Sequence, residues 1–130
     1  MTLAFWCVLV AGLLPFAAIA VAKSDKTFWR HNNLPREWEA KLTGRGARAH
    51  AAHLNSFEAF PLFTAAVIIA ALCKAPPPTV DGIAVAFVLA RATYIGCYLA
   101  DRASLRSIVW LVAFILNVSL FFVAAFAGAK

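Results

Sequence analysis

The clearest shortage in this sequence is of charge. Charged residues make up 14% of the chain against 63% hydrophobic residues, and only 6 of the 130 residues are acidic. Average globular domains are about half apolar and about a quarter charged, because they need a polar surface to face water. With a mean hydropathy of +0.79, this chain has too little polar surface for that role. The shortage excludes a soluble globular domain and indicates an integral membrane protein.

Several motifs that carry chemistry are also lacking. The sequence contains no Ser-His-Asp set, no phosphate-binding loop and no dinucleotide fingerprint. Its 3 cysteines, Cys7, Cys73 and Cys97, have no metal-ligand spacing, so we interpret them as buried free thiols. It also lacks a soluble basic face with stacking aromatics, which argues against a nucleic-acid partner. Any catalysis must therefore use a bound reactive group, such as the thiol of a co-substrate.

Long apolar runs, in contrast, are abundant. Four of them come near the roughly 20 residues that a helix needs to cross about 30 Å of hydrocarbon. Inside a bilayer the backbone must satisfy its own hydrogen bonds, so each run predicts a helix. The fold class is therefore all-α, an integral membrane bundle of four helices that forms a single domain over residues 1–130. The helices are expected at about 2–22, 47–73, 80–100 and 105–127, with a long loop at 23–46.

The first run is interpreted as a retained helix rather than as a cleaved signal peptide. No positive residue precedes it, and it is longer than the usual signal core of about 7–15 residues. The small residues in "AIAVAKSDK" leave cleavage as the alternative. Pro15 is expected to bend this helix, because its ring frees the carbonyl of Ala11.

The distribution of basic residues predicts the orientation in the membrane. Most of them lie in or beside the long loop and in the third connection: Lys23, Lys26, Arg30, Arg36, Lys41, Arg45, Arg48, Arg102 and Arg106. The opposite side has only Lys74 and Lys130. The positive-inside rule then places the loop in the cytoplasm and both termini outside, with a bacterial inner membrane as the expected location. Anionic membrane lipids are the expected neighbours of the net charge of +6.

Two of the predicted helices carry polar stripes. At roughly 100° per residue, each stripe lies along one side of its helix: Arg48, Ala51, Asn55, Glu58 and Leu62 on the second, then Arg91, Tyr94, Tyr98 and Arg102 on the third. A charge near the centre of a membrane helix costs roughly 2.5–3.5 kcal/mol on insertion scales, so such residues usually face a bundle interior. We expect Glu58 to pair with Arg91, with Arg48 or Arg106 as alternative partners nearer the surface. A purely structural ion-pair network is the alternative, but the matching faces favour a polar ligand site.

The side chains on these stripes suit a small zwitterionic peptide. Arginine binds a carboxylate through two parallel hydrogen bonds, and Glu58 could hold an ammonium group. Arg106 and Ser107 lie where the fourth helix starts. They are placed to stabilise a thiolate, because nearby positive charge and a helix N-terminus both lower the pKa of a thiol.

Two histidines allow a separate interpretation. His50 and His53 are three residues apart, which places both on one side of a helix, as a metal pair requires. The only other histidine is His31 in the loop, and a third ligand is not evident. We therefore predict histidines at the membrane interface and no metal site.

The polar stripes also carry a family resemblance. "RAHAAHLNSFEAFPLF" resembles the second-helix signature of the MAPEG family, the membrane-associated proteins in eicosanoid and glutathione metabolism. "RATYIGCYL" followed by "LRS" resembles the third helix and the start of the fourth in the same family. The similarity in layout covers essentially the whole chain, and the alanine-rich composition is typical of a bacterial member. The resemblance implies a homotrimer, with glutathione bound between neighbouring subunits on the cytoplasmic side.

The resemblance also implies a function and roles for individual residues. By matching position, the glutathione-binding residues would be Arg48, Asn55, Glu58, Arg91, Tyr94 and Tyr98. Arg106 would stabilise the thiolate, with Ser107 as its helper. The implied protein is a membrane-bound glutathione-dependent transferase or peroxidase that acts on lipophilic electrophiles or lipid peroxides. Glutathione would be its co-substrate, and the apolar small-molecule substrate would enter laterally from lipid.

Two other functions stay open. Leu54 and Ala51 stand where some members carry arginine, which argues against an eicosanoid substrate and leaves a non-catalytic protein of this fold as the first alternative. The second alternative is a small four-helix drug transporter. That function requires a lone carboxylate in the first helix, whereas Glu58 lies in the second helix among arginines that would repel cationic drugs.

Overall fold

The computed structural model of the protein describes residues 1–24, 27–30 and 33–128. These residues form helices without any strand: α1 (Leu3–Lys23), α2 (Thr27–Arg30), α3 (Pro35–Ala40), α4 (Gly44–Leu72), α5 (Pro77–Leu99) and α6 (Ala103–Gly128). Lys26, His31 and Lys130, which the sequence analysis considers, lie outside the described residues.

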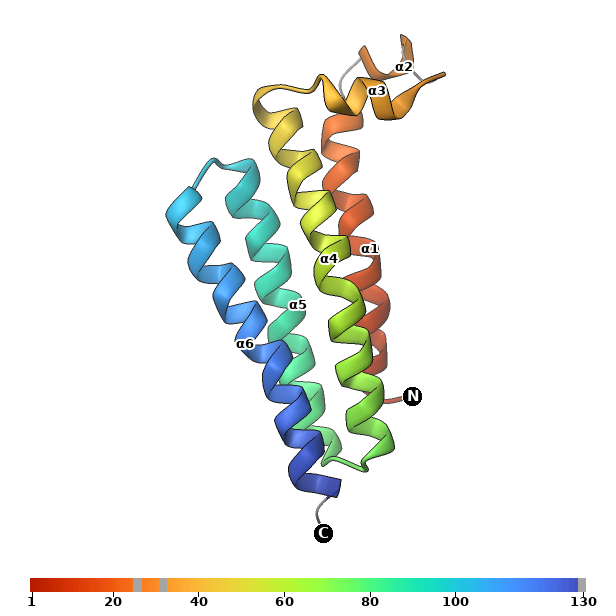
Figure 1. Cartoon of the computed structure of the whole chain (residues 1–130), viewed down its shortest axis with the longest axis vertical. Helices are drawn as coiled ribbons and strands as arrows, with labels where there is room; N and C mark the ends of the chain where they lie inside the picture. Colours follow the sequence, from red (N-terminus) through yellow and green to blue (C-terminus); the bar gives the residue numbers. More distant parts are fainter. Residues whose placement is uncertain (25–26, 31–32, 129–130) are drawn as a thin grey trace.

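The long helices α1, α4, α5 and α6 run side by side as an antiparallel bundle (Figure 1). They are between 21 and 29 residues long, and each is apolar enough to cross a membrane. α1 and α6 each pack against both α4 and α5, so the four helices surround one core. The start of α1 and the end of α6 lie at the end of the bundle opposite to α2 and α3 (Figure 1). The predicted all-α fold with four membrane-length helices is confirmed.

α1 and α4 approach each other closely because small side chains line their contact. The buried residues of α1 lie along one face of the helix: Ala4, Cys7, Ala11, Pro15, Ala18, Ile19 and Ala22. The buried residues of α4 that pack with α1 are also small: Ala49, Ala52 and Ser56. Lipid tails are as apolar as leucine, so membrane helices associate through such close packing. At Gly12, an added Cβ would lie only 3.2 Å from the ring of Phe60.

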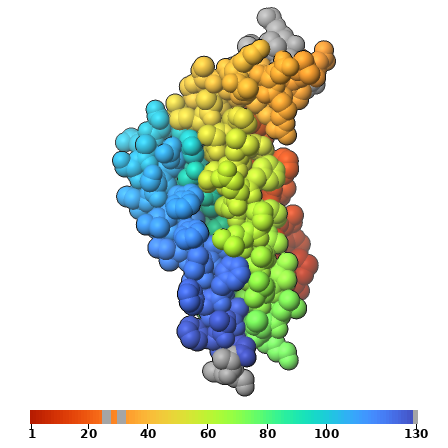
Figure 2. Space-filling model, in the orientation of Figure 1, coloured from red at the N-terminus to blue at the C-terminus, as the bar shows by residue number. Residues whose placement is uncertain are grey.

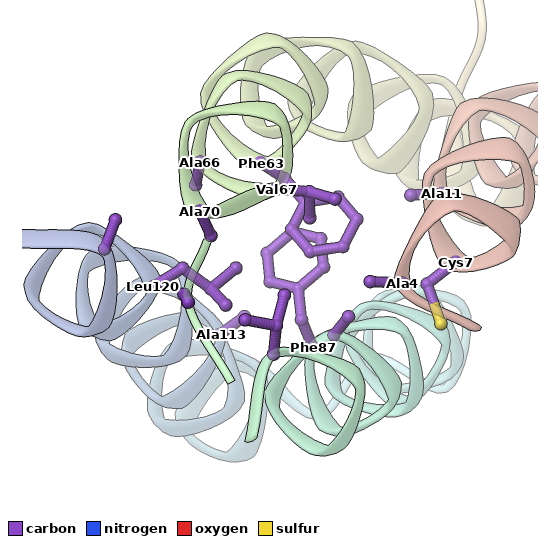
Figure 3. Packing of buried hydrophobic residues seen from close by; sticks show 14 residues of the cluster. Ala4, Cys7, Ala11, Phe63, Ala66, Val67, Ala70, Phe87, Ala113 and Leu120 are labelled. Atoms are coloured by element: carbon purple, nitrogen blue, oxygen red, sulfur yellow. The ribbon is translucent and has the colours of Figure 1, made fainter. Parts of the chain in front are cut away.

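Two aromatic rings fill the centre of the bundle. Phe63 of α4 and Phe87 of α5 are stacked, with ring centroids 4.0 Å apart and an angle of 12° between their planes (Figure 3). Val67 and Leu120 are buried in the same cluster. Interiors are close-packed, so neighbouring helices cannot slide past such a cluster without losing contacts. The cluster therefore fixes the relative height of α4 and α5, and with it the height of their polar residues.

The segment between α1 and α4 covers one end of the bundle. Phe28 and Trp38 lie edge to face with centroids 5.1 Å apart, and both pack on the ends of α1 and α4. The buried carboxylate of Glu39 accepts a 2.9 Å hydrogen bond from Arg36 and lies 3.8 Å from His50 of α4. The segment expected as a loop at 23–46 thus contains two short helices, because its aromatic side chains are anchored on the bundle.

At the other end, a carboxylate of α5 caps the start of α1. The backbone N–H of Ala4 donates to Oδ1 of Asp81 over 2.7 Å. The first N–H groups of a helix have no partner within that helix, and the helix dipole favours a negative charge beside them. The contact therefore stabilises α1 and ties it to α5.

We predict that Asp81→Ala lowers the free energy of unfolding by about 1 kcal/mol, the usual cost of losing a helix cap. Thermal unfolding in detergent, followed by circular dichroism, measures the change. Asp81→Asn is the matched variant, because its amide oxygen can still accept the Ala4 N–H, and it should keep most of the stability. Unchanged stability in Asp81→Ala would contradict the cap.

Candidate ligand-binding site

A buried arginine organises the polar residues at the α4–α5 contact. Arg91 of α5 is only 3% exposed. Its Nη2 donates to Oδ1 of Asn55 over 3.0 Å and to Oγ of Ser56 over 3.3 Å, both on α4. Asn55 Nδ2 donates in turn to Oε2 of Glu58 over 3.0 Å. The amide of Asn55 therefore links Arg91 to Glu58, in place of the direct pair expected from the sequence.

The two tyrosines of α5 continue from Arg91 toward the α5–α6 turn. The guanidinium carbon of Arg91 lies 4.3 Å from the ring centroid of Tyr94, and Tyr94 meets Tyr98 edge to face with centroids 5.5 Å apart. The guanidinium carbon of Arg106 on α6 then lies 4.4 Å from the centroid of Tyr98. Cation–π contacts of this kind are favourable, more so when they are shielded from water. The structure thus brings these four predicted site residues into one continuous row.

Two other predicted site residues have different partners. Nη1 of Arg48 lies 3.6 Å from Oδ2 of Asp101, in the turn between α5 and α6. Ser107 is exposed, and its hydroxyl donates to the carbonyl of Ala103 on its own helix over 3.1 Å. Arg48 therefore lies at the rim of the α4–α5 contact, and Ser107 stands beside Arg106 with its proton directed to the helix backbone.

The histidines and cysteines are dispersed rather than clustered. Nδ1 of His53 lies 2.7 Å from the carbonyl oxygen of Pro15, so this ring is buried between α4 and α1. Cys7 and Cys97 are buried free thiols, and Cys73 is partly exposed. Within the described part of the chain, no three His, Cys, Asp or Glu side chains gather as a metal site would require.

A pocket of about 180 Å³ lies beside Arg91, between α4, α5 and α6. In Figure 2, part of α5 (teal) is seen at the bottom of a furrow between α4 (yellow-green) and α6 (blue). The polar end of the pocket is formed by Asn55, Glu58 and Arg91. The remaining lining is mostly apolar: Ala59, Leu62, Phe87, Trp110, Ala113, Phe114 and Asn117.

Sequence reasoning missed the α6 wall of this pocket and the role of Ser56. The fourth apolar run shows no polar stripe that would indicate which side faces the bundle. One signal was available in the sequence, because the amide of Asn117 interrupts a long apolar run and polar residues in membrane helices usually face the interior. For Ser56, the signal was its place directly after Asn55 on a helix already predicted to carry a site.

We predict that Asn55→Ala lowers the free energy of unfolding by about 1–3 kcal/mol, because it removes a partner from a buried guanidinium. Combined with Arg91→Met, the loss should be clearly less than the sum of the two single losses, since each variant breaks the same contact. Thr93→Val is a suitable control, because its hydroxyl bonds only to Leu89 on its own helix. Additive losses in the double variant, measured by thermal unfolding, would contradict the network.

Comparison with known proteins gives one match, which covers nearly the whole chain. A family model described as MAPEG family matches residues 3–126, a range that includes the polar row and the pocket. No curated protein and no solved structure matches the chain. The match agrees with four helices that are each long and apolar enough to span a membrane. The chain is therefore an integral membrane protein and belongs to the MAPEG family, the membrane-associated proteins in eicosanoid and glutathione metabolism.

Proposed function

We propose that this protein is a membrane-bound glutathione-dependent transferase or peroxidase that acts on lipophilic electrophiles or lipid peroxides. The observation that carries the proposal is the buried Arg91, which is held by Asn55 and Ser56 beside a pocket and connected through two tyrosines to Arg106. Family membership supports the same metabolic context.

The polar end of the pocket matches the charged groups of glutathione. A guanidinium has five N–H donors, and the described hydrogen bonds of Arg91 use only Nη2, so other N–H groups remain for a ligand carboxylate. Glu58 accepts from Asn55 through Oε2 and can hold the ammonium group through its other oxygen. Arg48 at the rim can bind the second carboxylate. The ring hydroxyls of Tyr94 and Tyr98 add hydrogen-bonding groups along the row.

Arg106 is the proposed thiolate-stabilising residue. It lies in the first turn of α6, where its own charge and the helix N-terminus both favour an anion. In a transferase step the thiolate attacks the electrophilic carbon and forms a C–S bond, and either a leaving group departs with its electron pair or the displaced π pair of the electrophile is protonated. A peroxidase step transfers one oxygen to the sulfur and releases an alcohol, after which a second glutathione gives the disulfide and water. Ser107 can assist once its hydroxyl turns away from the Ala103 carbonyl.

A homotrimer is the assembly that we propose. Glu58 is exposed on α4 at membrane depth, where an uncovered carboxylate is costly. Beside it, Leu54 and Phe57 are also exposed. A neighbouring subunit on this face of α4 would shield the carboxylate from lipid and would place the glutathione site at a subunit boundary.

The orientation that we propose has the α2–α3 end in the cytoplasm of a bacterial cell and both termini across the inner membrane. Arg48, Arg102 and Arg106 all belong to that end of the bundle, as the positive-inside rule requires.

A non-catalytic member of the family is the second candidate. Two contacts favour it: Arg48 is already paired with Asp101, and the Ser107 hydroxyl is already bonded to its own helix. A protein of this kind would keep the fold and lack thiol chemistry.

We predict that the purified protein binds glutathione in detergent and that Glu58→Gln and Arg91→Ala each abolish binding. Isothermal titration calorimetry at millimolar glutathione measures both effects. Asp81→Asn is the matched control, because it makes the same kind of carboxylate-to-amide change at the opposite end of the bundle, and it should bind like the wild type. An absence of binding heat for the wild-type protein would remove glutathione as the ligand.

We predict that Arg106→Ala slows the conjugation of glutathione to a chromogenic electrophile by at least about tenfold, because a positive charge that stabilises the reacting anion is lost. Arg102→Ala removes an exposed arginine one turn earlier and should react at the wild-type rate. Glutathione affinity is measured alongside, so that a loss of binding is separated from a loss of rate. Equal rates for wild type and Arg106→Ala would exclude Arg106 from the mechanism.

A further inference from the structure

A second pocket, of about 240 Å³, lies where the start of α1 meets the turn between α4 and α5. This is the end of the bundle opposite to α2 and α3 (Figure 1), and none of the proposed glutathione-binding residues lines it. The floor of the pocket is made of side chains that are at most 6% exposed: Ala4, Val67, Ala75 and Val80. The rim is made of exposed residues: Thr2, Ala71, Lys74 and Pro77. The pocket therefore has a buried, apolar floor and an accessible rim.

Two side chains of opposite charge line this pocket, Lys74 from the α4–α5 turn and Asp81 from α5. Asp81 accepts the Ala4 N–H through Oδ1, and its Oδ2 has no partner among the residues that the structure describes. Within the same described residues, the ammonium group of Lys74 has no hydrogen bond and forms no ion pair, with Asp81 or with any other carboxylate. One positive and one negative group are therefore both available to a ligand in an otherwise apolar pocket.

The position of the pocket suits a membrane lipid. It lies at the ends of three membrane-length helices, where the hydrocarbon of a bilayer gives way to the headgroups. It also lies apart from the subunit contact proposed around Glu58. At roughly 100° per residue, Val67 in the floor of the pocket is about 180° around α4 from Glu58. A neighbouring subunit that covers Glu58 therefore leaves this pocket on the opposite side of α4.

We propose that this pocket binds a zwitterionic phospholipid with a primary ammonium group, a phosphatidylethanolamine. The phosphate binds Lys74, the ammonium group donates to Oδ2 of Asp81, and the start of one acyl chain lies over Val67 and Val80. A cavity of about 150 Å³ with apolar walls can hold benzene, so the roughly 240 Å³ here has room for the first part of a chain. This inference goes beyond the proposed function, because it concerns another ligand at the other end of the bundle.

The charges in the pocket select this headgroup over the two common alternatives. A lipid with a net negative charge satisfies Lys74 but brings no cation to Asp81, which repels it. A choline headgroup brings a cation, but its quaternary nitrogen has no N–H to donate to Oδ2. Hydrogen bonds between charged groups are stronger than those between neutral groups, so the ethanolamine ammonium gains a contact that the other two headgroups lack.

Three short-chain lipids with identical acyl chains test the headgroup. The full chain in detergent, without glutathione, is titrated with dioctanoyl phosphatidylethanolamine, phosphatidylcholine or phosphatidylglycerol, and the lipid-bound fraction is measured by native mass spectrometry. We expect the ethanolamine lipid to bind about fivefold more tightly than either of the others, as one additional hydrogen bond predicts. Equal affinities for the three lipids, or the highest affinity for phosphatidylglycerol, would overturn the proposal.

The same headgroup without acyl chains separates a membrane lipid from a soluble phosphate compound. Glycerophosphoethanolamine should displace the lipid poorly, because the burial of the acyl chain contributes much of the affinity. Displacement at a concentration equal to that of the lipid would overturn the assignment to a membrane lipid.

Two variants test the charged groups. Asp81→Asn keeps an acceptor for the Ala4 N–H and removes the negative charge, so the affinity for the ethanolamine lipid should fall to that for the choline lipid. Lys74→Gln should weaken the binding of all three lipids about fivefold, because they share the phosphate. Glutamine is as strained as lysine by the left-handed backbone at this position, where φ is 56°. Lys41→Gln removes a lysine from the opposite end of the bundle and should bind lipid like the wild type. A preference for ethanolamine that persists in Asp81→Asn would overturn the proposal.

A third variant tests the space itself. Ala71→Phe fills the rim of the pocket and should weaken the binding of all three lipids. Leu72→Phe is the matched control, because Leu72 is 76% exposed and does not line the pocket. Equal binding by these two variants would place the lipid elsewhere and overturn the proposal. The wild-type comparison of the three lipids decides alone if a variant does not fold. Because glutathione is absent throughout, failure here is separate from failure of the glutathione assignment.

Discussion

The arrangement of polar groups in this bundle depends on the burial of one guanidinium. Removing Arg91 from water is costly unless its N–H groups are bonded. Asn55 and Ser56 satisfy part of that requirement from α4. Because the guanidinium cannot shift without losing these bonds, it fixes one face of α5 against one face of α4. Glu58 and Tyr94, which contact the same groups, are fixed by it in turn.

The stacked rings of Phe63 and Phe87 also constrain α4 against α5, within the apolar core. They set the height of α4 relative to α5, while the hydrogen bonds of Arg91 lie one turn further along α5 and set which faces meet. Apolar packing is non-directional, whereas hydrogen bonds also require particular donor and acceptor directions. The two together define one register for these helices.

Local properties of the sequence predicted the fold. The contacts between side chains of different helices were predicted only in part. Helix length and hydropathy are properties of single segments, so four membrane helices followed directly from the apolar runs. The row from Arg91 to Tyr98 also followed, because it lies along one helix. The sequence did not predict the partner of Arg48, since Asp101 approaches it only because of the path of the α5–α6 turn. The sequence also did not predict the contact between His53 and Pro15, because this contact depends on how α1 packs against α4. Asn117 was missed although it interrupts an apolar run, because that signal indicates an inward direction and not which side chains the amide meets.

The two described hydrogen bonds of Arg91 both go to α4, whereas α6 contributes the Arg106–Tyr98 contact and one wall of the pocket. The polar network and the apolar wall of the pocket are therefore formed mainly by different helices. α4 and α5 provide the hydrogen-bonded network around Arg91, while Trp110, Ala113 and Phe114 on α6 line the apolar wall of the pocket. Trp110 and Phe114 are partly exposed, so these two side chains can change in size without disturbing the bonds of the buried guanidinium. Substitutions at Trp110 or Phe114 can therefore change the shape of the pocket while the bonds that hold α4 and α5 together stay in place.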